Sequence, residues 1–176
     1  MARLDAMSCA IRTEALDLAQ LVEHVVHEYT YHAQRMDCTL DCDMAPAWVE
    51  GNLDELATLL RNLLDNAIRF ARDGGRVQVA CGAGPQGPWL NVSDDGPGVP
   101  EAERTAIFQR FYRLPGHQGR GSGIGLSLVA AIARLHAARI ETGDGLGGKG
   151  FLVRIAFAPV AATAAAAVRT RTDSPA

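Results

Sequence analysis

Gly119-Arg120-Gly121-Ser122-Gly123-Ile124-Gly125-Leu126 places glycines at alternate positions ahead of an apolar, proline-free segment, 126–135. Glycine has no Cβ, so a phosphate can approach the backbone N–H groups of such a loop closely. Segment 126–135 is apolar on most of its circumference and predicts a buried helix that begins at the glycines. The first N–H groups of a helix lack intrahelical partners, and the helix dipole is positive there. The loop and helix start therefore predict a phosphate site, with a plain tight turn as the alternative.

A second polar patch lies on a helix that is expected to begin after Asn52. The apolar residues of this helix follow helical spacing: Leu56, Leu59, Leu60, Leu63, Ala67 and Phe70. Asn62, Asn66 and Arg69 lie at i, i+4 and i+7, so they share one face that borders the apolar stripe. Amide oxygens can ligate a hard cation, and a guanidinium can bind a phosphate. The alternative is a solvated polar edge of a helix.

A third patch begins where a predicted strand, 89–93, runs into Asp94-Asp95-Gly96-Pro97-Gly98. A carboxylate at a strand end can accept a hydrogen bond from an exocyclic amine such as that of adenine. An ordinary Asp-Gly turn is the alternative. The following segment, 99–120, combines large apolar side chains with arginines and predicts a mobile lid over a nucleotide. These residues are Ile107, Phe108, Phe111, Tyr112, Arg104, Arg110, Arg113 and Arg120.

The remaining chain predicts one domain. A helix is expected over 18–35, with Asp17 at its start. Strands are expected over 38–42, 48–50, 76–81, 89–93, 139–142 and 151–157, with a Gly- and Pro-rich loop over 82–88. Residues 15–158 are thus assigned to the domain, 1–14 to a linker from a missing upstream domain, and 159–176 to a disordered tail.

Composition limits the class of protein. The chain has 176 residues, of which 48% are hydrophobic, enough for one domain with a sizeable core. A net charge of −3 leaves no basic footprint for nucleic acid or for direct contact with a membrane. No run of ~18 apolar residues predicts a membrane span. The four cysteines are scattered, which favours reduced thiols over disulfides or a metal site.

Taken in order, the patches resemble the catalytic, ATP-binding domain of bacterial sensor histidine kinases. That domain belongs to the group shared with type II topoisomerases, Hsp90-type chaperones and mismatch-repair ATPases. Asn62-Leu63-Leu64-Asp65-Asn66-Ala67 is similar to the N box, and Asp94-Asp95-Gly96-Pro97-Gly98 to the first glycine box. Ile107-Phe108-Gln109-Arg110-Phe111-Tyr112-Arg113 is similar to the F box, and Gly121-Ser122-Gly123-Ile124-Gly125-Leu126 to the second glycine box.

The resemblance implies a fold and a set of site residues. The fold is an α/β, two-layer sandwich of the Bergerat type, in which a mixed β-sheet packs on three main helices. By resemblance Asn66 ligates Mg²⁺ with Asn62 assisting, and Asp94 accepts from the adenine amine of ATP. Arg69 is expected to meet a phosphate, and Arg113 to act in the transfer together with the asparagines. The other implied nucleotide contacts are Gly96, Gly98, Tyr112, Gly121, Ser122, Gly123, Ile124, Gly125 and Leu126.

One position bears on the type of reaction. In the hydrolysing relatives a glutamate activates water four residues before the metal-binding asparagine, and this chain has Asn62 there. A neutral amide cannot act as a general base. We therefore expect slow hydrolysis and transfer of the γ-phosphate to a histidine on a separate dimerisation domain, with a response regulator receiver domain acting afterwards. An ATPase-driven conformational module and a nucleotide-binding module without phosphotransfer are the alternatives.

The histidines of the chain do not resemble the family's phosphoacceptor. None of His24, His27, His32, His117 and His136 has the expected sequence surroundings. The substrate histidine is therefore expected on another part of the parent kinase, and a monomeric fragment is expected because the family's dimerisation helices are missing. Family habit implies a cytoplasmic domain of a protein anchored in the bacterial inner membrane. Ala137-Ala138 replaces the glycines usual after the position of His136, so a different turn is expected there.

Overall fold

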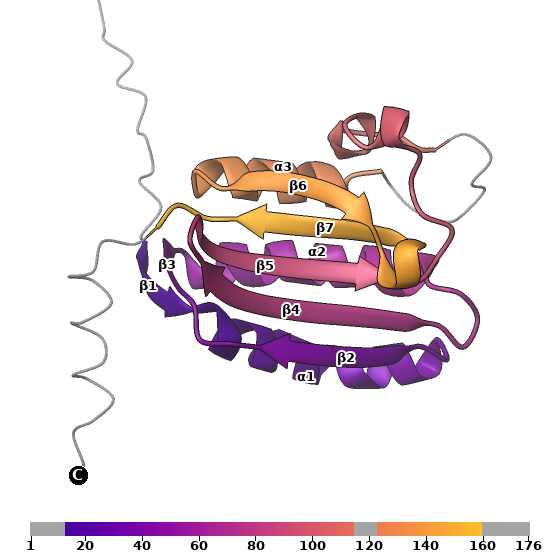
Figure 1. Cartoon of the computed structure of the whole chain (residues 1–176), viewed down its shortest axis with the longest axis horizontal. Helices are drawn as coiled ribbons and strands as arrows, with labels where there is room; N and C mark the ends of the chain where they lie inside the picture. Colours follow the sequence, from indigo (N-terminus) through magenta and orange to yellow (C-terminus); the bar gives the residue numbers. More distant parts are fainter. Residues whose placement is uncertain (1–12, 115–122, 160–176) are drawn as a thin grey trace, which may run out of the picture.

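The computed structural model describes residues 13–114 and 123–159, and Figure 1 shows their arrangement. The first half comprises β1 (Glu14–Asp17), α1 (Leu18–Arg35), β2 (Thr39–Met44), β3 (Trp48–Gly51), α2 (Leu53–Phe70), β4 (Arg76–Gly84) and β5 (Gly87–Asp94). Two short 3₁₀ helices follow, η1 (Glu101–Glu103) and η2 (Ala106–Phe108). The second half comprises α3 (Gly125–Leu135), β6 (Arg139–Asp144), the 3₁₀ helix η3 (Leu146–Gly148) and β7 (Phe151–Ala156).

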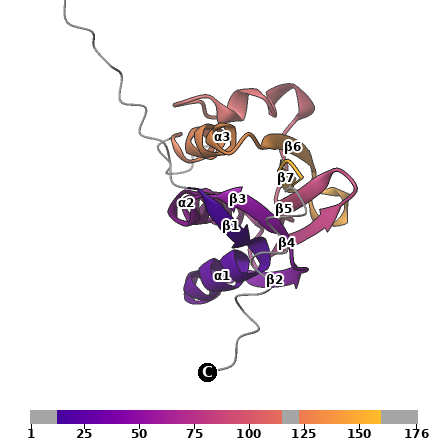
Figure 2. The same cartoon turned by 90° about the vertical axis from the view of Figure 1, so that its left-hand side faces the viewer.

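A five-stranded sheet has the strand order β2-β4-β5-β7-β6. β2 is parallel to β4 and the other neighbours are antiparallel, which confirms the predicted mixed sheet. β1 and β3 form a separate antiparallel pair. Figure 2 shows that α1, α2 and α3 all cover the same face of the sheet. The predicted two-layer sandwich is therefore confirmed.

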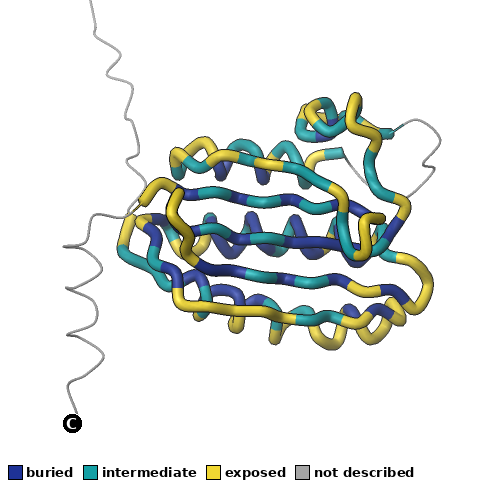
Figure 3. The backbone as a smooth tube through the Cα atoms, viewed as in Figure 1, coloured by how far each residue is buried: buried dark blue, intermediate teal, exposed yellow. Residues whose placement is uncertain are grey.

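The core lies between the sheet and its helical layer, and α2 is the middle helix (Figures 2 and 3). α2 buries Leu56, Ala57, Leu59, Leu60, Leu63, Leu64, Ala67 and Ile68. Alternate residues of the strands meet this face: Val77, Val79, Cys81, Leu90, Val92, Val153 and Ile155. Burying one such aliphatic side chain contributes about 2 kcal/mol. This packing fixes the rotation of α2 and thereby the direction of its polar edge.

Side-chain caps and one histidine fix the ends of the helices. Asn52 caps α2, because its side-chain oxygen accepts from Glu55 N at 3.0 Å, as its sequence position predicts. Asp17 caps α1 by accepting from Ala19 N. His136 joins the end of α3 to the start of α2, since its Nε2 accepts from Asn52 N at 3.0 Å. Its Nδ1 lies 2.8 Å from Ile132 O, a carbonyl one turn earlier in α3.

Two expectations are wrong. α3 is not a buried helix, because it lies at one end of the helical layer and only its inner side packs on α2. Leu128 is 37% exposed and Leu135 59% exposed. The loop expected over 82–88 is a tight turn at 85–86, with strands continuing on both sides. Within β4 the indole ring of Trp89 packs over Gly82, and a Cβ there would lie only 3.0 Å from that ring.

The turn after α3 keeps a form that glycine usually provides. Ala137 has a φ of 49°, in the left-handed region, and Ala138 N donates to Ala133 O at 2.9 Å. This hydrogen bond closes the C-terminus of the helix in the manner of a Schellman motif. The pair Ala137-Ala138 thus makes a turn of the kind that glycine usually provides.

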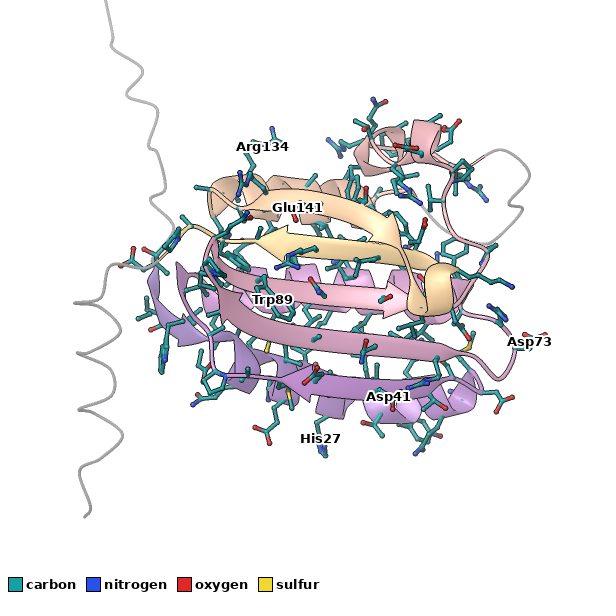
Figure 4. The ribbon with its side chains drawn as sticks, in the orientation of Figure 1. His27, Asp41, Asp73, Trp89, Arg134 and Glu141 are labelled. Carbon is teal, nitrogen blue, oxygen red and sulfur yellow. The ribbon has the colours of Figure 1, made fainter. Side chains whose placement is uncertain are left out.

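The outward face of the sheet is polar at its centre. Trp89 and Glu141 lie on this face in Figure 4. Arg154 links them, with its guanidinium 4.8 Å from the Trp89 ring and its Nε 3.7 Å from a Glu141 carboxylate oxygen. Across residues 13–114 and 123–159, no helix is both long and apolar enough to cross a membrane.

Candidate functional site

A cavity of about 400 Å³ lies between α2, the start of α3, the end of β5 and segment 99–114, which we call the lid segment. It brings together residues that are distant in the sequence. From α2 come Asn62, Asp65, Asn66, Arg69 and Phe70, and from the end of β5 and the turn after it come Asp94, Pro97 and Gly98. The lid segment supplies Val99, Ile107, Tyr112, Arg113 and Leu114, the glycine loop before α3 supplies Gly123 and Ile124, α3 supplies Gly125 and Leu126, and β7 supplies Phe151.

The polar edge of α2 forms one wall of the cavity. Asn62 Nδ2 donates to Thr58 O at 2.8 Å, which directs Asn62 Oδ1 toward α3. A Cβ added at Gly125 would lie 3.1 Å from Asn62 Oδ1, so the asparagine and the glycine meet across the cavity wall. Asn66 and Arg69 follow on the same edge and line the cavity. The i, i+4, i+7 face predicted from sequence is therefore turned into the cavity.

Asp94 forms the buried polar end of the cavity and is only 4% exposed. Its Oδ1 accepts from Gly96 N at 2.8 Å and from Phe151 N at 3.2 Å, which fixes the orientation of the carboxyl group. Burial raises the pKa of Asp94, and the two backbone hydrogen bonds oppose this rise. A carboxylate held through one oxygen is suited to accept a hydrogen bond from a ligand amine with the other.

Gly96 supports Asp94 and does not line the cavity. A Cβ at this position would collide with the carbonyl oxygen of Phe70, so no larger residue fits between α2 and the turn. Gly98 does line the cavity, and its φ of 79° is in the region that favours glycine. Within the first glycine box, Gly96 thus packs against α2, whereas Gly98 lines the cavity.

The start of α3 faces the cavity. Gly123, Ile124, Gly125 and Leu126 line it, whereas Gly121 and Ser122 lie outside the described residues. Ile124 is the N-cap residue, and its apolar side chain offers no acceptor for the first N–H groups of the helix. An anion is the natural partner for such a helix terminus.

The lid segment covers one side of the cavity. Ile107 is buried, and η2 packs on α3. Phe111 N donates to Gly123 O at 2.9 Å, which ties the lid segment to the glycine loop. The Tyr112 hydroxyl donates to the Glu103 carboxylate, and this hydrogen bond raises the pKa of Tyr112. Tyr112 and Arg113 both line the cavity, and the tyrosine hydroxyl is hydrogen-bonded within the lid segment.

Several residues of the cavity are not evident from the sequence. Phe151 supplies both wall surface and the backbone N–H that holds Asp94. Asp65 of α2 also lines the cavity. Successive residues of a helix lie about 100° apart around its axis, so Asp65 does not share a face with Asn66, and no local pattern distinguishes it from a solvated residue. The contact of Phe151 depends on the pairing of β5 with β7, which a single sequence does not reveal.

The arrangement suits a planar, amine-bearing ring attached to an anionic chain. Apolar side chains such as Val99, Ile107 and Leu114 provide surface for the ring, and the buried Asp94 provides an acceptor. Arg69, Arg113 and the start of α3 provide positive charge and N–H groups. The volume falls within the range of about 300–1,000 Å³ typical of ligand pockets. The donor set therefore fits a nucleotide polyphosphate, with amide oxygens available for a hard cation.

Comparison with known proteins gives a consistent result. Residues 51–161 match the family "Histidine kinase-, DNA gyrase B-, and HSP90-like ATPase". The chain is 38% identical over 156 residues to the sensor protein kinase PmrB of Pseudomonas aeruginosa, covering 88% of this chain and 33% of PmrB. It is 33% identical over 182 residues to the sensor histidine kinase TmoS of Ectopseudomonas mendocina, covering 99% of this chain and 19% of TmoS.

Solved structures agree. The mycobacterial sensor histidine kinase MprB matches with a TM-score of 0.75 and 27% identity, covering 84% of this chain and 100% of that one. Full-length ShkA in complex with AMPPNP matches with a TM-score of 0.72 and 25% identity, covering 88% of this chain and 33% of that one. Of the two full-length relatives compared by sequence, the chain spans 33% of the length of PmrB and 19% of the length of TmoS.

Proposed function

The chain belongs to the histidine kinase-, DNA gyrase B- and HSP90-like ATPase family, and on that premise we propose that it binds Mg-ATP and donates the γ-phosphate to a histidine on a separate dimerisation domain of its parent kinase. The observation that carries this proposal is the shared cavity, in which the N-box edge, Asp94 and the start of α3 converge. The adenine would lie against Asp94, and the triphosphate against Arg69, Arg113 and the α3 terminus.

Asn66 and Asn62 are the residues that would hold Mg²⁺ through their amide oxygens. The bound ion would supply positive charge against the triphosphate. Asn62 supports this assignment because its Nδ2 is committed to Thr58 O, leaving its oxygen directed toward Gly125. The second glycine box, including Gly121 and Ser122, would donate N–H groups to the phosphates.

Asn62 also supports transfer to a protein nucleophile over transfer to water. Its side chain is a neutral amide at the position that bears a glutamate in the hydrolysing relatives. It cannot remove a proton from water, so the γ-phosphate is preserved for a histidine. Transfer then depends on positioning and charge stabilisation, which the cavity residues provide.

An exposed apolar surface beside the cavity supports a protein partner. Phe111, Ile124 and Leu128 are 66%, 39% and 37% exposed. The hydrogen bond from Phe111 N to Gly123 O holds the lid segment next to the start of α3. Exposed apolar groups of this kind mark interaction sites. We place the dimerisation domain on this surface, with a response regulator receiver domain acting on the phosphohistidine afterwards.

The proposed setting follows from the same chemistry. ATP is a cytoplasmic substrate, so the domain would act in the cytoplasm, and the parent kinase would anchor it to the bacterial inner membrane. The isolated chain would be a monomer, because dimerisation is assigned to the separate domain.

The purified chain alone is expected to bind ATP but to hydrolyse it slowly and to acquire no label. This follows from Asn62 and from the unsuitable surroundings of the five histidines. The measurement is incubation with γ-labelled ATP and Mg²⁺, followed by assay of released phosphate and of acid-labile label on the chain. Asn66→Ala serves as the control for contaminating activity. Rapid phosphate release that this substitution abolishes would favour the ATPase module instead.

Asp94→Asn is expected to abolish the preference for ATP over GTP. The amide keeps the shape of the side chain but presents an N–H₂ group to the adenine amine, at a loss of about 1–3 kcal/mol in ATP affinity. The measurement is titration with both nucleotides.

The preference of the wild type for ATP should also depend on pH. Because burial raises the pKa of Asp94, this preference should weaken as the pH falls, starting above the range of an exposed carboxyl group. ATP and GTP carry the same triphosphate, so protonation of the triphosphate at low pH changes both affinities equally and leaves their ratio unaffected. If Asp94→Asn keeps the wild-type preference for ATP over GTP, Asp94 only stabilises the turn after β5 and does not contact the adenine.

A further inference from the structure

Tyr29 of α1 reaches across to a cavity residue of α2. Its hydroxyl donates to Asp65 Oδ1 at 3.0 Å and lies 3.3 Å from Arg61 O. Burial and the adjacent Asp65 carboxylate raise the pKa of Tyr29, so the phenol remains a donor. The Tyr29 ring also meets His32 edge-on, with 6.0 Å between the ring centroids. One oxygen of a cavity-lining carboxylate is therefore held from outside the cavity.

A second bridge joins the same two helices without touching the cavity. Arg61 Nε and Nη2 donate to the two Glu28 oxygens at 3.0 and 3.2 Å. His24 Nε2 lies 3.3 Å from Glu28 Oε1. Arg61 and Glu28 do not line the cavity, whereas Asp65 does. The two bridges thus differ in whether their α2 residue lines the cavity, and the Arg61–Glu28 ion pair offers a control that leaves Asp65 in place.

Asp65 precedes Asn66 in the sequence, is exposed, and lines the same cavity as Asn66, which the proposed function assigns to Mg²⁺. Magnesium ions in nucleotide sites keep several water molecules, and carboxylates next to the ligands orient those waters. Without the ion, a carboxylate at the same place repels a triphosphate. A negative charge here therefore favours metal-bound ATP and disfavours metal-free ATP.

We infer that Asp65 accepts hydrogen bonds from the water shell of Mg²⁺ and makes the site select metal-bound over metal-free ATP, with Tyr29 as the residue that positions it. This inference rests on the proposed function, since it needs a metal–nucleotide complex in the cavity. Asp65 Oδ1 accepts from Tyr29, so Oδ2 is the oxygen that serves the waters. Tyr29 acts only through Asp65.

The test is the ratio of ATP affinities with Mg²⁺ and with a chelator, measured by calorimetry. In Asp65→Asn the ratio of the two affinities should fall about tenfold, which is the lower end of the loss seen when a residue that supports a metal ligand is replaced. In Tyr29→Phe it should fall about threefold, as for loss of one hydrogen bond. Arg61→Gln, which breaks only the Glu28 bridge, should keep the wild-type ratio. Thermal unfolding of each variant confirms that it is folded.

The outcomes separate this inference from the proposed function. A merely structural role would weaken both affinities equally and leave the ratio unchanged, which would overturn the inference. A changed ratio in Asp65→Asn alone would overturn the positioning role of Tyr29. If the ratio survives in Asp65→Asn but is lost in Asn66→Ala, the proposed function stands without this inference. If the wild type shows no gain in affinity with Mg²⁺, the proposed function itself fails.

Discussion

Asn66→Ala is expected to remove about 2–4 kcal/mol of Mg-ATP binding, the scale of one charge-assisted interaction in a partly buried site. Asn66 lines the cavity one helical turn after Asn62, and its amide oxygen is the proposed ligand of Mg²⁺. The substitution removes the ligand but no core side chain, so the fold should persist. Calorimetric titration with Mg²⁺ should show the weaker binding, and titration with a chelator should show little change.

Asn91→Ala provides a matched control for this prediction. Asn91 is on β5, outside the residues that line the cavity, and its Oδ1 has no hydrogen-bond partner among residues 13–114 and 123–159. Removing this amide should leave the affinity for Mg-ATP unchanged. If Asn66→Ala retains both the affinity and its dependence on Mg²⁺, the metal assignment on α2 is wrong.

Much of the fold can be predicted because it depends on local patterns. The apolar spacing of α2 and the cap at Asn52 set the helix, and the same spacing directs Asn62, Asn66 and Arg69 to one edge. The run of the strand 89–93 into Asp94 places a carboxylate at the end of β5, where the structure buries it. Each of these inferences needs only residues that are close in the sequence.

The parts that could not be predicted depend on distant contacts. The pair of β1 and β3 joins short segments with no distinct alternation. The exposure of Leu128 and Leu135 depends on the place of α3 at one end of the helical layer. The link from Tyr29 to Asp65 crosses 36 residues, and no motif marks it. Gly96 likewise packs behind Asp94 because of the position of Phe70, which only the tertiary structure supplies.

Transfer of the γ-phosphate to a separate histidine-bearing domain tests the central claim most directly. The experiment incubates the chain with γ-labelled ATP, Mg²⁺ and the purified dimerisation domain of its parent kinase. Because Asn62 offers no general base at the position where the hydrolysing relatives carry a glutamate, acid-labile label should accumulate on the added domain alone. Asn66→Ala should abolish that label, whereas Asn91→Ala should retain it. Phosphate release without label on the added domain would contradict the claim, and so would label on this chain that is absent in His117→Ala.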